Sequence, residues 1–206
     1  MTDANPQQSS TRSHPGSALP TTTQQPHGRA PRPQAGVPEP DTADRLPRRV
    51  TAETASVWWL GVHGGAGEST LATLAADTRA AGHAWPYPTD PAGTQRVVLL
   101  ARTNYAGLVA VQRAAIEWAS GSLGTGVELG GLVLIADAPG RRPKPLRDLQ
   151  QVVAGGLPRA WVLPWVDDWR YGPPTPETGL PRPFHELFAD LSLTLTSTSA
   201  HNRKDS

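Results

Sequence analysis

The chain has 206 residues, a formal net charge of +1 and a hydrophobic fraction of 37%. This length suits one ordinary domain, but 22 prolines and 20 glycines indicate that part of the chain lies outside a packed core. The absence of cysteine excludes disulfides, thiolate nucleophiles and cysteine metal sites, and the near-neutral charge provides no strong field for nucleic acid or an anionic membrane.

Location and cofactors can be predicted from the same composition. No run of about 18 apolar residues occurs, and the first thirty residues lack an apolar segment, so we expect neither a membrane span nor a signal peptide. A cytoplasmic protein is the resulting prediction. The six histidines show no ligand-like spacing, so we also expect no metal site.

The N-terminal quarter, residues 1–51, is predicted to be a disordered arm. Its first fifty residues contain nine prolines and no Phe, Trp or Tyr. Such a segment cannot bury enough apolar surface to offset an ordering cost of roughly 1–2 kcal/mol per residue. The arm is either a solvated tail or a partner-binding segment.

Residues 52–172 show the pattern of a three-layer α/β sandwich with a mainly parallel sheet. Continuous apolar runs occur at residues 57–62, 97–101, 132–136 and 161–166. Continuous rather than alternating runs are typical of parallel strands that are covered on both faces. Amphipathic stretches separate the runs, as in successive strand–helix units, and Pro164 is expected to mark a strand end or a sheet edge.

Helices are predicted between these runs. One extends from a glycine-rich turn through Thr78 to Gly82, and a second extends from an Asn104 cap to Gly121. A third begins near Pro145 and ends at Gly155. Residues 173–192 are predicted to form a Pro-rich loop and a short closing helix, and residues 193–206 a disordered tail.

The segment that carries chemical information is residues 62–70, Val-His-Gly-Gly-Ala-Gly-Glu-Ser-Thr, between the first strand and the first helix. In a working phosphate loop, glycines turn backbone N–H groups toward the phosphates, a lysine contacts the terminal phosphates and a Ser or Thr hydroxyl holds magnesium. The glycines and hydroxyls are present here, but the lysine is absent. The candidate binding residues are Gly64, Gly65, Gly67, Glu68, Ser69 and Thr70.

This loop resembles the deviant phosphate loop of the partition and division-site ATPases, the MinD/ParA-like branch, whose pattern is Lys-Gly-Gly-x-Gly-Lys-Ser/Thr-Thr. His63 replaces the signature lysine and Glu68 replaces the phosphate-loop lysine. As topology, the resemblance extends over about residues 55–170, and it implies a truncated P-loop fold. The chain is also similar to short uncharacterised actinobacterial proteins that share the glycine-rich loop.

Glu68 has two interpretations. A carboxylate here opposes a polyphosphate, and one unit charge pair at about 4 Å and an effective dielectric of about 20 is worth about 4 kcal/mol. Alternatively, Glu68 serves as the loop's own anion at a helix N-terminus, which typically contributes ~0.3–1 kcal/mol. Weak binding of a phosphate or nucleotide is the remaining alternative, and no other cofactor is expected.

Asp137, at the end of the third apolar run, also has two interpretations. If that run is the magnesium-site strand of the resembled family, Asp137 is functional; if it is a later strand, Asp137 is loop entry. We favour the second, because only residues 83–96 separate the first helix from the second strand. In the resembled family that interval carries extra strands and a catalytic carboxylate, so its shortness argues against hydrolysis.

Two further groups of residues attract interest. Arg141, Arg142, Lys144 and Arg147 form a basic cluster that is either a solvated loop or a patch for a phosphate or a partner. Trp161, Trp165 and Trp169 recur every fourth residue, which on one strand places them on one face. We expect Trp161 in the core, and Trp165 and Trp169 are candidates for a partner surface.

The sequence therefore predicts a non-catalytic, P-loop-derived scaffold or accessory protein with no catalytic residues, which acts through protein partners. The resemblance suggests partition, plasmid transfer or secretion as the context, and a homodimer is allowed. The alternative is a nucleotide-binding protein whose loop cation comes from Arg141 or a second subunit. A nucleic-acid binder that uses the arm is a third class, which the near-neutral charge disfavours.

Overall fold

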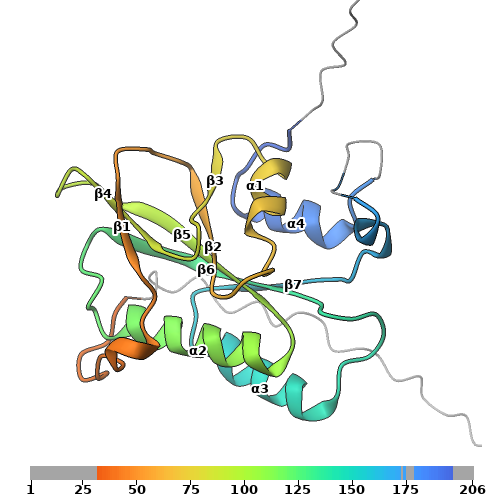
Figure 1. The fold of residues 1–206 in the computed structure, drawn as a ribbon, viewed down its shortest axis with the longest axis horizontal. Coiled ribbons are helices and arrows are strands. Elements are labelled where there is room, and N and C mark those ends of the chain that lie inside the picture. Colours follow the sequence, from red (N-terminus) through yellow and green to blue (C-terminus); the bar gives the residue numbers. More distant parts are fainter. Residues whose placement is uncertain (1–31, 173, 175–178, 197–206) are drawn as a thin grey trace, which may run out of the picture. The chain divides into compact units, whose positions relative to one another are not determined.

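A computed structural model describes residues 32–172, 174 and 179–196 of the chain. Its centre is a sheet of five parallel strands in the order β3-β2-β5-β6-β7 (Figure 1). The strands are β2 (Val57–Gly61), β3 (Thr78–Ala80), β5 (Gln95–Arg102), β6 (Val127–Ile135) and β7 (Ala160–Leu163). The four predicted runs are therefore strands of one parallel sheet.

Helices cover both faces of this sheet, which confirms the predicted three-layer α/β architecture (Figure 1). They are α1 (Glu68–Leu74), α2 (Tyr105–Ala119), α3 (Lys144–Gly155) and α4 (Arg182–Asp190). Helices α2 and α3 lie on one face, and α1 and α4 lie on the other. As predicted, the Asn104 side chain caps α2 by accepting the Gly107 N–H at 2.8 Å.

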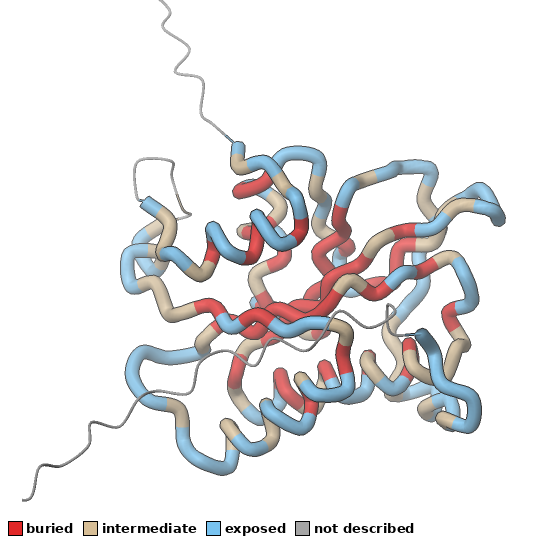
Figure 2. The backbone as a smooth tube through the Cα atoms, turned by 180° about the vertical axis from the view of Figure 1, so that it is seen from behind, coloured by how far each residue is buried: buried red, intermediate tan, exposed pale blue. Residues whose placement is uncertain are grey.

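Two apolar cores result, one on each side of the sheet. Alternate residues of a strand point to opposite faces, so Trp58 and Leu60 of β2 pack toward α2 and α3. Val57 and Trp59 pack toward α1 and α4. Figure 2 shows buried residues along the sheet and on the helix sides that face it. Burial on both faces explains why the strand sequences are continuously apolar.

A second, two-stranded sheet pairs β1 (Arg48–Thr51) with β4 (Trp85–Pro88) in parallel. It follows a short 3₁₀ helix, η1 (Thr42–Asp44). The described structure thus begins before residue 52, where the sequence analysis placed the end of the arm. Residues 1–31 of the predicted arm lie outside the described residues.

The first helix is shorter than the helix that the apolar spacing predicted. It ends at Leu74, and Thr78 belongs to β3, where it pairs with Val57. The interval 83–96 contains β4 (Trp85–Pro88), which corrects the expectation that its shortness leaves no room for extra strands. Ala75 has an extended backbone and forms an isolated antiparallel bridge with Leu195.

The C-terminal part combines confirmed and revised expectations. Strand β7 ends at Leu163, so Pro164 does mark a strand end. The predicted closing helix is α4, which buries Phe184, Leu187 and Phe188. Residues 193–196 of the predicted tail are described and contact the end of α1, whereas residues 197–206 lie outside the described part. No helix in the described part is long and apolar enough to span a membrane.

Candidate functional site

The candidate site lies where the chain leaves β2 and β5. Strand β2 leads into α1 on one face, and β5 leads into α2 on the other, so the carboxyl ends of these neighbouring strands form a topological switch point. Open α/β sheets bind their ligands at such positions. A hollow of about 260 Å³ occurs here, and its lining residues are Gly65, Ala66, Gly67, Glu68, Ser69, Thr70, His83 and Arg102.

The glycines of the loop are required by its backbone. Gly65 and Gly67 have φ values of 73° and 102°, in the left-handed region that other residues rarely adopt. Gly67 is also the N-cap of α1, and a Cβ atom on Gly67 would lie 2.8 Å from the Ile135 side chain. The loop therefore has the glycine-dependent turn that the sequence predicted, and five of the six candidate binding residues (all except Gly64) line the hollow.

Glu68 does not point out toward a ligand; it is buried, with 7% of its surface exposed. Its Oε2 accepts the backbone N–H of Gly61 at 2.8 Å. His83 Nδ1 lies 2.7 Å from the Gly61 carbonyl oxygen and 3.7 Å from Glu68 Oε1. Strand β3 ends at Ala80, so Glu68 and His83 satisfy the polar groups of β2 that a longer β3 would have paired.

This geometry revises the interpretation of Glu68 as an anion for the first turn of its own helix. The strong partner of its carboxylate is a strand N–H seven residues earlier in the chain. The close approach also explains why residue 61 is glycine, because a Cβ atom there would lie 3.2 Å from both Glu68 Oε2 and His83 Nδ1. Glu68 is thus a structural carboxylate beneath the loop.

His63, in the same loop, is also held by backbone groups. Its Nε2 accepts the Arg102 N–H at 3.0 Å, and its Nδ1 lies 2.8 Å from the Gly64 carbonyl oxygen. Both contacts fit a neutral ring with its proton on Nδ1. His63 thereby ties the loop to the end of β5, and Gly107 at the start of α2 leaves room for the ring.

Arg102 is the cation beside the loop, and the sequence analysis missed it. Its Nε donates to the Gly65 carbonyl at 2.9 Å and its Nη1 donates to the Ala136 carbonyl at 3.1 Å. Burial lowers the pKa of Arg102, and the nearby Asp137 carboxylate partly opposes this effect. The sequence does contain a feature that could have identified Arg102: it directly follows an apolar run that is predicted to be a parallel strand.

Asp137 follows β6, which is separated from the loop strand β2 by β5. Its Oδ1 accepts the Thr103 hydroxyl at 2.6 Å, and its N–H donates to the same hydroxyl at 3.2 Å. Within the described residues, Asp137 does not line the hollow. The contacts make it a residue that joins the ends of β5 and β6, in agreement with the loop-entry interpretation.

The basic cluster after β6 divides into paired and unpaired members. Lys144 forms an ion pair with Asp148 at 2.6 Å, and Arg147 donates to the Arg142 carbonyl at 2.9 Å. Burial lowers the pKa of Arg142; Asp137 raises it and Arg147 lowers it further. Arg141 was the candidate to replace the missing loop lysine. It is exposed and does not line the hollow in the described structure.

The three spaced tryptophans do not share a strand face, which corrects the sequence prediction. Only Trp161 belongs to β7; it is buried and donates to Asp190 at 2.9 Å. Trp165 lies beyond the strand end, and Trp169 lies in a 3₁₀ helix, η2 (Asp167–Arg170). Trp169 packs edge-on against Phe184 at 5.0 Å, so it contributes to the core rather than to a free surface.

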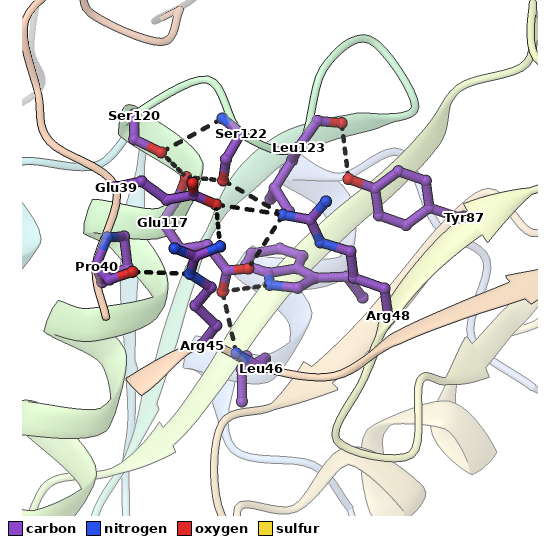
Figure 3. A network of polar contacts seen from close by, with 11 residues as sticks. Glu39, Pro40, Arg45, Leu46, Arg48, Tyr87, Glu117, Ser120, Ser122 and Leu123 are labelled. Atoms are coloured by element: carbon purple, nitrogen blue, oxygen red, sulfur yellow. Dashed lines mark hydrogen bonds and ion pairs between the residues drawn. The ribbon is translucent and has the colours of Figure 1, made fainter. Parts of the chain in front are cut away.

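A second polar constellation surrounds Glu117, in the last turn of α2 (Figure 3). Glu117 is fully buried, and its Oε2 accepts from the Leu46 N–H at 3.1 Å and from Trp85 Nε1 at 2.9 Å. Its Oε1 has no hydrogen-bond partner among the described residues, although Arg48 Nη2 lies 3.7 Å away. The sequence analysis did not identify Glu117. The feature that could have indicated its burial is an acidic residue within the apolar side of a predicted helix.

Comparison with known proteins yields one match. A family model described as a family of unknown function (DUF6668) matches residues 55–182, from just before β2 to the start of α4. No curated protein and no solved structure gives a significant match.

Proposed function

The chain belongs to this family of unknown function, and from its own residues we propose that it is a non-catalytic scaffold or accessory protein that acts through protein partners. Its domain would be a degenerate relative of the P-loop ATPases. Partition, plasmid transfer or secretion is the context that the loop resemblance suggests, and that part of the proposal is an analogy.

The observation that carries the proposal is the inward orientation of Glu68. In a working phosphate loop this position provides a lysine that neutralises the terminal phosphates. Here it provides a buried carboxylate whose hydrogen bond goes to Gly61. A polyphosphate over the loop would lose the attraction of that lysine, about 4 kcal/mol at about 4 Å and an effective dielectric of about 20, and Glu68 provides no cation to replace it. Such a change removes several decades of affinity.

The other titratable groups of the hollow support the same conclusion. His83 is held at the Gly61 carbonyl, and Arg102 is held at the Gly65 carbonyl. General acid–base catalysis needs a group within hydrogen-bond reach of a substrate proton. In this hollow the described titratable side chains all contact backbone groups of β2 or of the loop, so they serve the loop's own structure.

One observation favours a second candidate function, the binding of a small phosphorylated ligand. Arg102 lines the hollow at the switch point, and its two recorded hydrogen bonds use two of the five guanidinium N–H groups. A guanidinium that keeps free donors can bind a phosphate. Arg102 would then replace the missing lysine.

Calorimetric titration of ATP, ADP and GTP with magnesium into the wild-type chain separates the two functions. We expect no binding with a Kd below about one millimolar, which corresponds to about −4.1 kcal/mol. Micromolar binding by wild type that is lost in Arg102→Ala and kept in Arg113→Ala would overturn the proposal and establish the second function. Arg113 is a suitable control because it pairs with Asp44 on the surface of α2.

A further inference from the structure

Many arginines of the described chain pair with a carboxylate, but the arginines at the carboxyl edge of the sheet do not. Arg45, Arg113 and Arg182, for example, each form an ion pair with a carboxylate at 3.0 Å or less. In the described structure no such pair involves the arginine that ends β5 or the arginines that follow β6. These are Arg102, Arg141, Arg142 and Arg147.

Hydrogen bonds bring Arg102, Arg142 and Arg147 to the segment that follows β6, because Arg102 Nη1 donates to the Ala136 carbonyl and Arg147 Nη1 donates to the Arg142 carbonyl. Arg102 and Arg142 both interact with the charge of Asp137, and Arg147 repels Arg142 while it donates to the Arg142 carbonyl. Burial lowers the pKa of both Arg102 and Arg142, and Asp137 is the single carboxylate that offsets this in each case. One carboxylate shared by several guanidinium groups leaves an excess of positive charge in a partly buried place.

An exposed aromatic side chain lies at the start of the helix that follows Arg102. Tyr105 begins α2 three residues after Arg102, and 68% of its surface is exposed. Arginine and tyrosine are enriched in the parts of protein interfaces that contribute most to binding. We call Arg102, Tyr105, Arg141, Arg142 and Arg147 the carboxyl-edge surface.

We propose that the carboxyl-edge surface binds an acidic segment of a partner protein, whose carboxylates pair with Arg141 and Arg142 while an apolar side chain packs on Tyr105. This inference rests on the proposed function, because it names the kind of partner through which the chain acts. The guanidinium group binds a carboxylate in a bidentate manner, which combines charge with geometric specificity. The Asp137 carboxylate is already occupied by the Thr103 hydroxyl, so it leaves Arg141 and Arg142 available to an incoming carboxylate.

A protein is favoured over a nucleic acid by the charge distribution. Nucleic-acid binding takes its affinity from many phosphate contacts and a strongly basic surface. The chain has a net charge of +1, and the basic residues of this edge lie beside Asp137 and Asp148. A short group of arginines next to an exposed tyrosine fits a few carboxylates better than a continuous phosphate backbone.

The test uses fluorescence anisotropy with the full chain and a labelled octaglutamate peptide at low salt, because screening weakens exposed ion pairs. The variant Arg141→Glu/Arg142→Glu is expected to raise the Kd at least about tenfold, the change that ~1.4 kcal/mol produces. The control Arg113→Glu/Arg182→Glu changes the net charge equally at exposed sites elsewhere and is expected to change the Kd less than about twofold. Backbone amide shifts should change at Arg102 and Tyr105.

Several outcomes would overturn the inference. Equal weakening by both double variants would mean that the peptide responds only to the net charge of the chain. Tighter binding of oligo-dT of equal charge would make the surface a nucleic-acid site, and no octaglutamate binding at millimolar concentration would remove the site. If ATP binds and displaces the peptide, the proposed non-catalytic function also fails. If ATP does not bind, the peptide results test only the carboxyl-edge surface.

Discussion

At the scale of single residues, Glu68 determines what the loop can do. Burying a carboxylate is costly unless hydrogen bonds replace its water, and Glu68 has the Gly61 N–H for this purpose, with His83 3.7 Å from its other oxygen. The Gly61 N–H also depends on Glu68, because β3 ends at Ala80 and Glu68 Oε2 accepts this N–H in place of a strand carbonyl. The stability of the loop therefore depends on an acceptor at position 68.

Replacing Glu68 should lower the free energy of unfolding in a defined order. Glu68→Gln keeps an oxygen acceptor and is expected to lose least. Glu68→Ala leaves the buried Gly61 N–H unsatisfied and should cost about 1–3 kcal/mol, and Glu68→Lys should cost more because it replaces an acceptor with a charged donor. Urea unfolding measures each change. A lysine variant as stable as wild type would show that the carboxylate is not inside.

The sequence could predict the position of the loop but not the direction of its side chains. The glycine pattern and the missing lysines are visible in the sequence itself. The contacts of Glu68 and His83 depend on where β3 ends, and the contacts of His63 and Arg102 depend on β5 lying beside β2. These are tertiary facts, and the spacing within one segment contains no information about them.

At the scale of elements, long strands and capped helices were predictable and short strands were not. Strands β2, β5 and β6 are buried on both faces, so their apolar runs are unmistakable. Strands β1, β3 and β4 have only three or four residues each and show no periodicity. Strand β4 also contains two prolines, which normally argue against a strand.

Removal of residues 194–206 should destabilise α1. The Thr194 carbonyl accepts the Ala76 N–H at 2.8 Å, and Thr196 donates to the Leu74 and Thr73 carbonyls at 3.0 and 2.8 Å. At roughly 0.5–1.5 kcal/mol per hydrogen bond, the loss of these three bonds is about 1.5–4.5 kcal/mol. The matched control is a chain that ends at Thr196, so the difference between the two truncations isolates residues 194–196. Equal protection of α1 from hydrogen exchange in both would contradict the prediction.

At the scale of the whole molecule, the sequence indicated the layered architecture but not the second sheet. Alternation of apolar runs and amphipathic stretches is enough to predict a three-layer α/β fold, whereas strand order depends on contacts between distant segments. The sheet of β1 and β4 was not predicted, because residues 48–51 follow a long Pro-rich segment and were assigned to the same disordered arm. Strand β1 also lies before the residues that the family model matches.

Glu117 connects these distant segments, so its loss should affect the molecule as a whole. Glu117→Ala would leave the Leu46 N–H and Trp85 Nε1 without an acceptor and Arg48 without a buried countercharge. Each N–H group left without an acceptor typically costs about 1–3 kcal/mol, and the partly exposed Arg48 adds little because water can solvate it.

Urea unfolding followed by tryptophan fluorescence would measure the loss, and Glu117→Gln should lose less because its amide oxygen can still accept the two N–H groups. Asp44→Ala is the comparison, since the Asp44–Arg113 pair is partly exposed and such pairs contribute about 0–1 kcal/mol. A double-mutant cycle with Arg48→Ala isolates the ionic part of the Glu117 contribution. If Glu117→Ala costs no more than Asp44→Ala, the buried carboxylate does not hold the β1–β4 sheet against α2, and that sheet must be held by the apolar contacts of Leu46, Trp85 and Tyr87 alone.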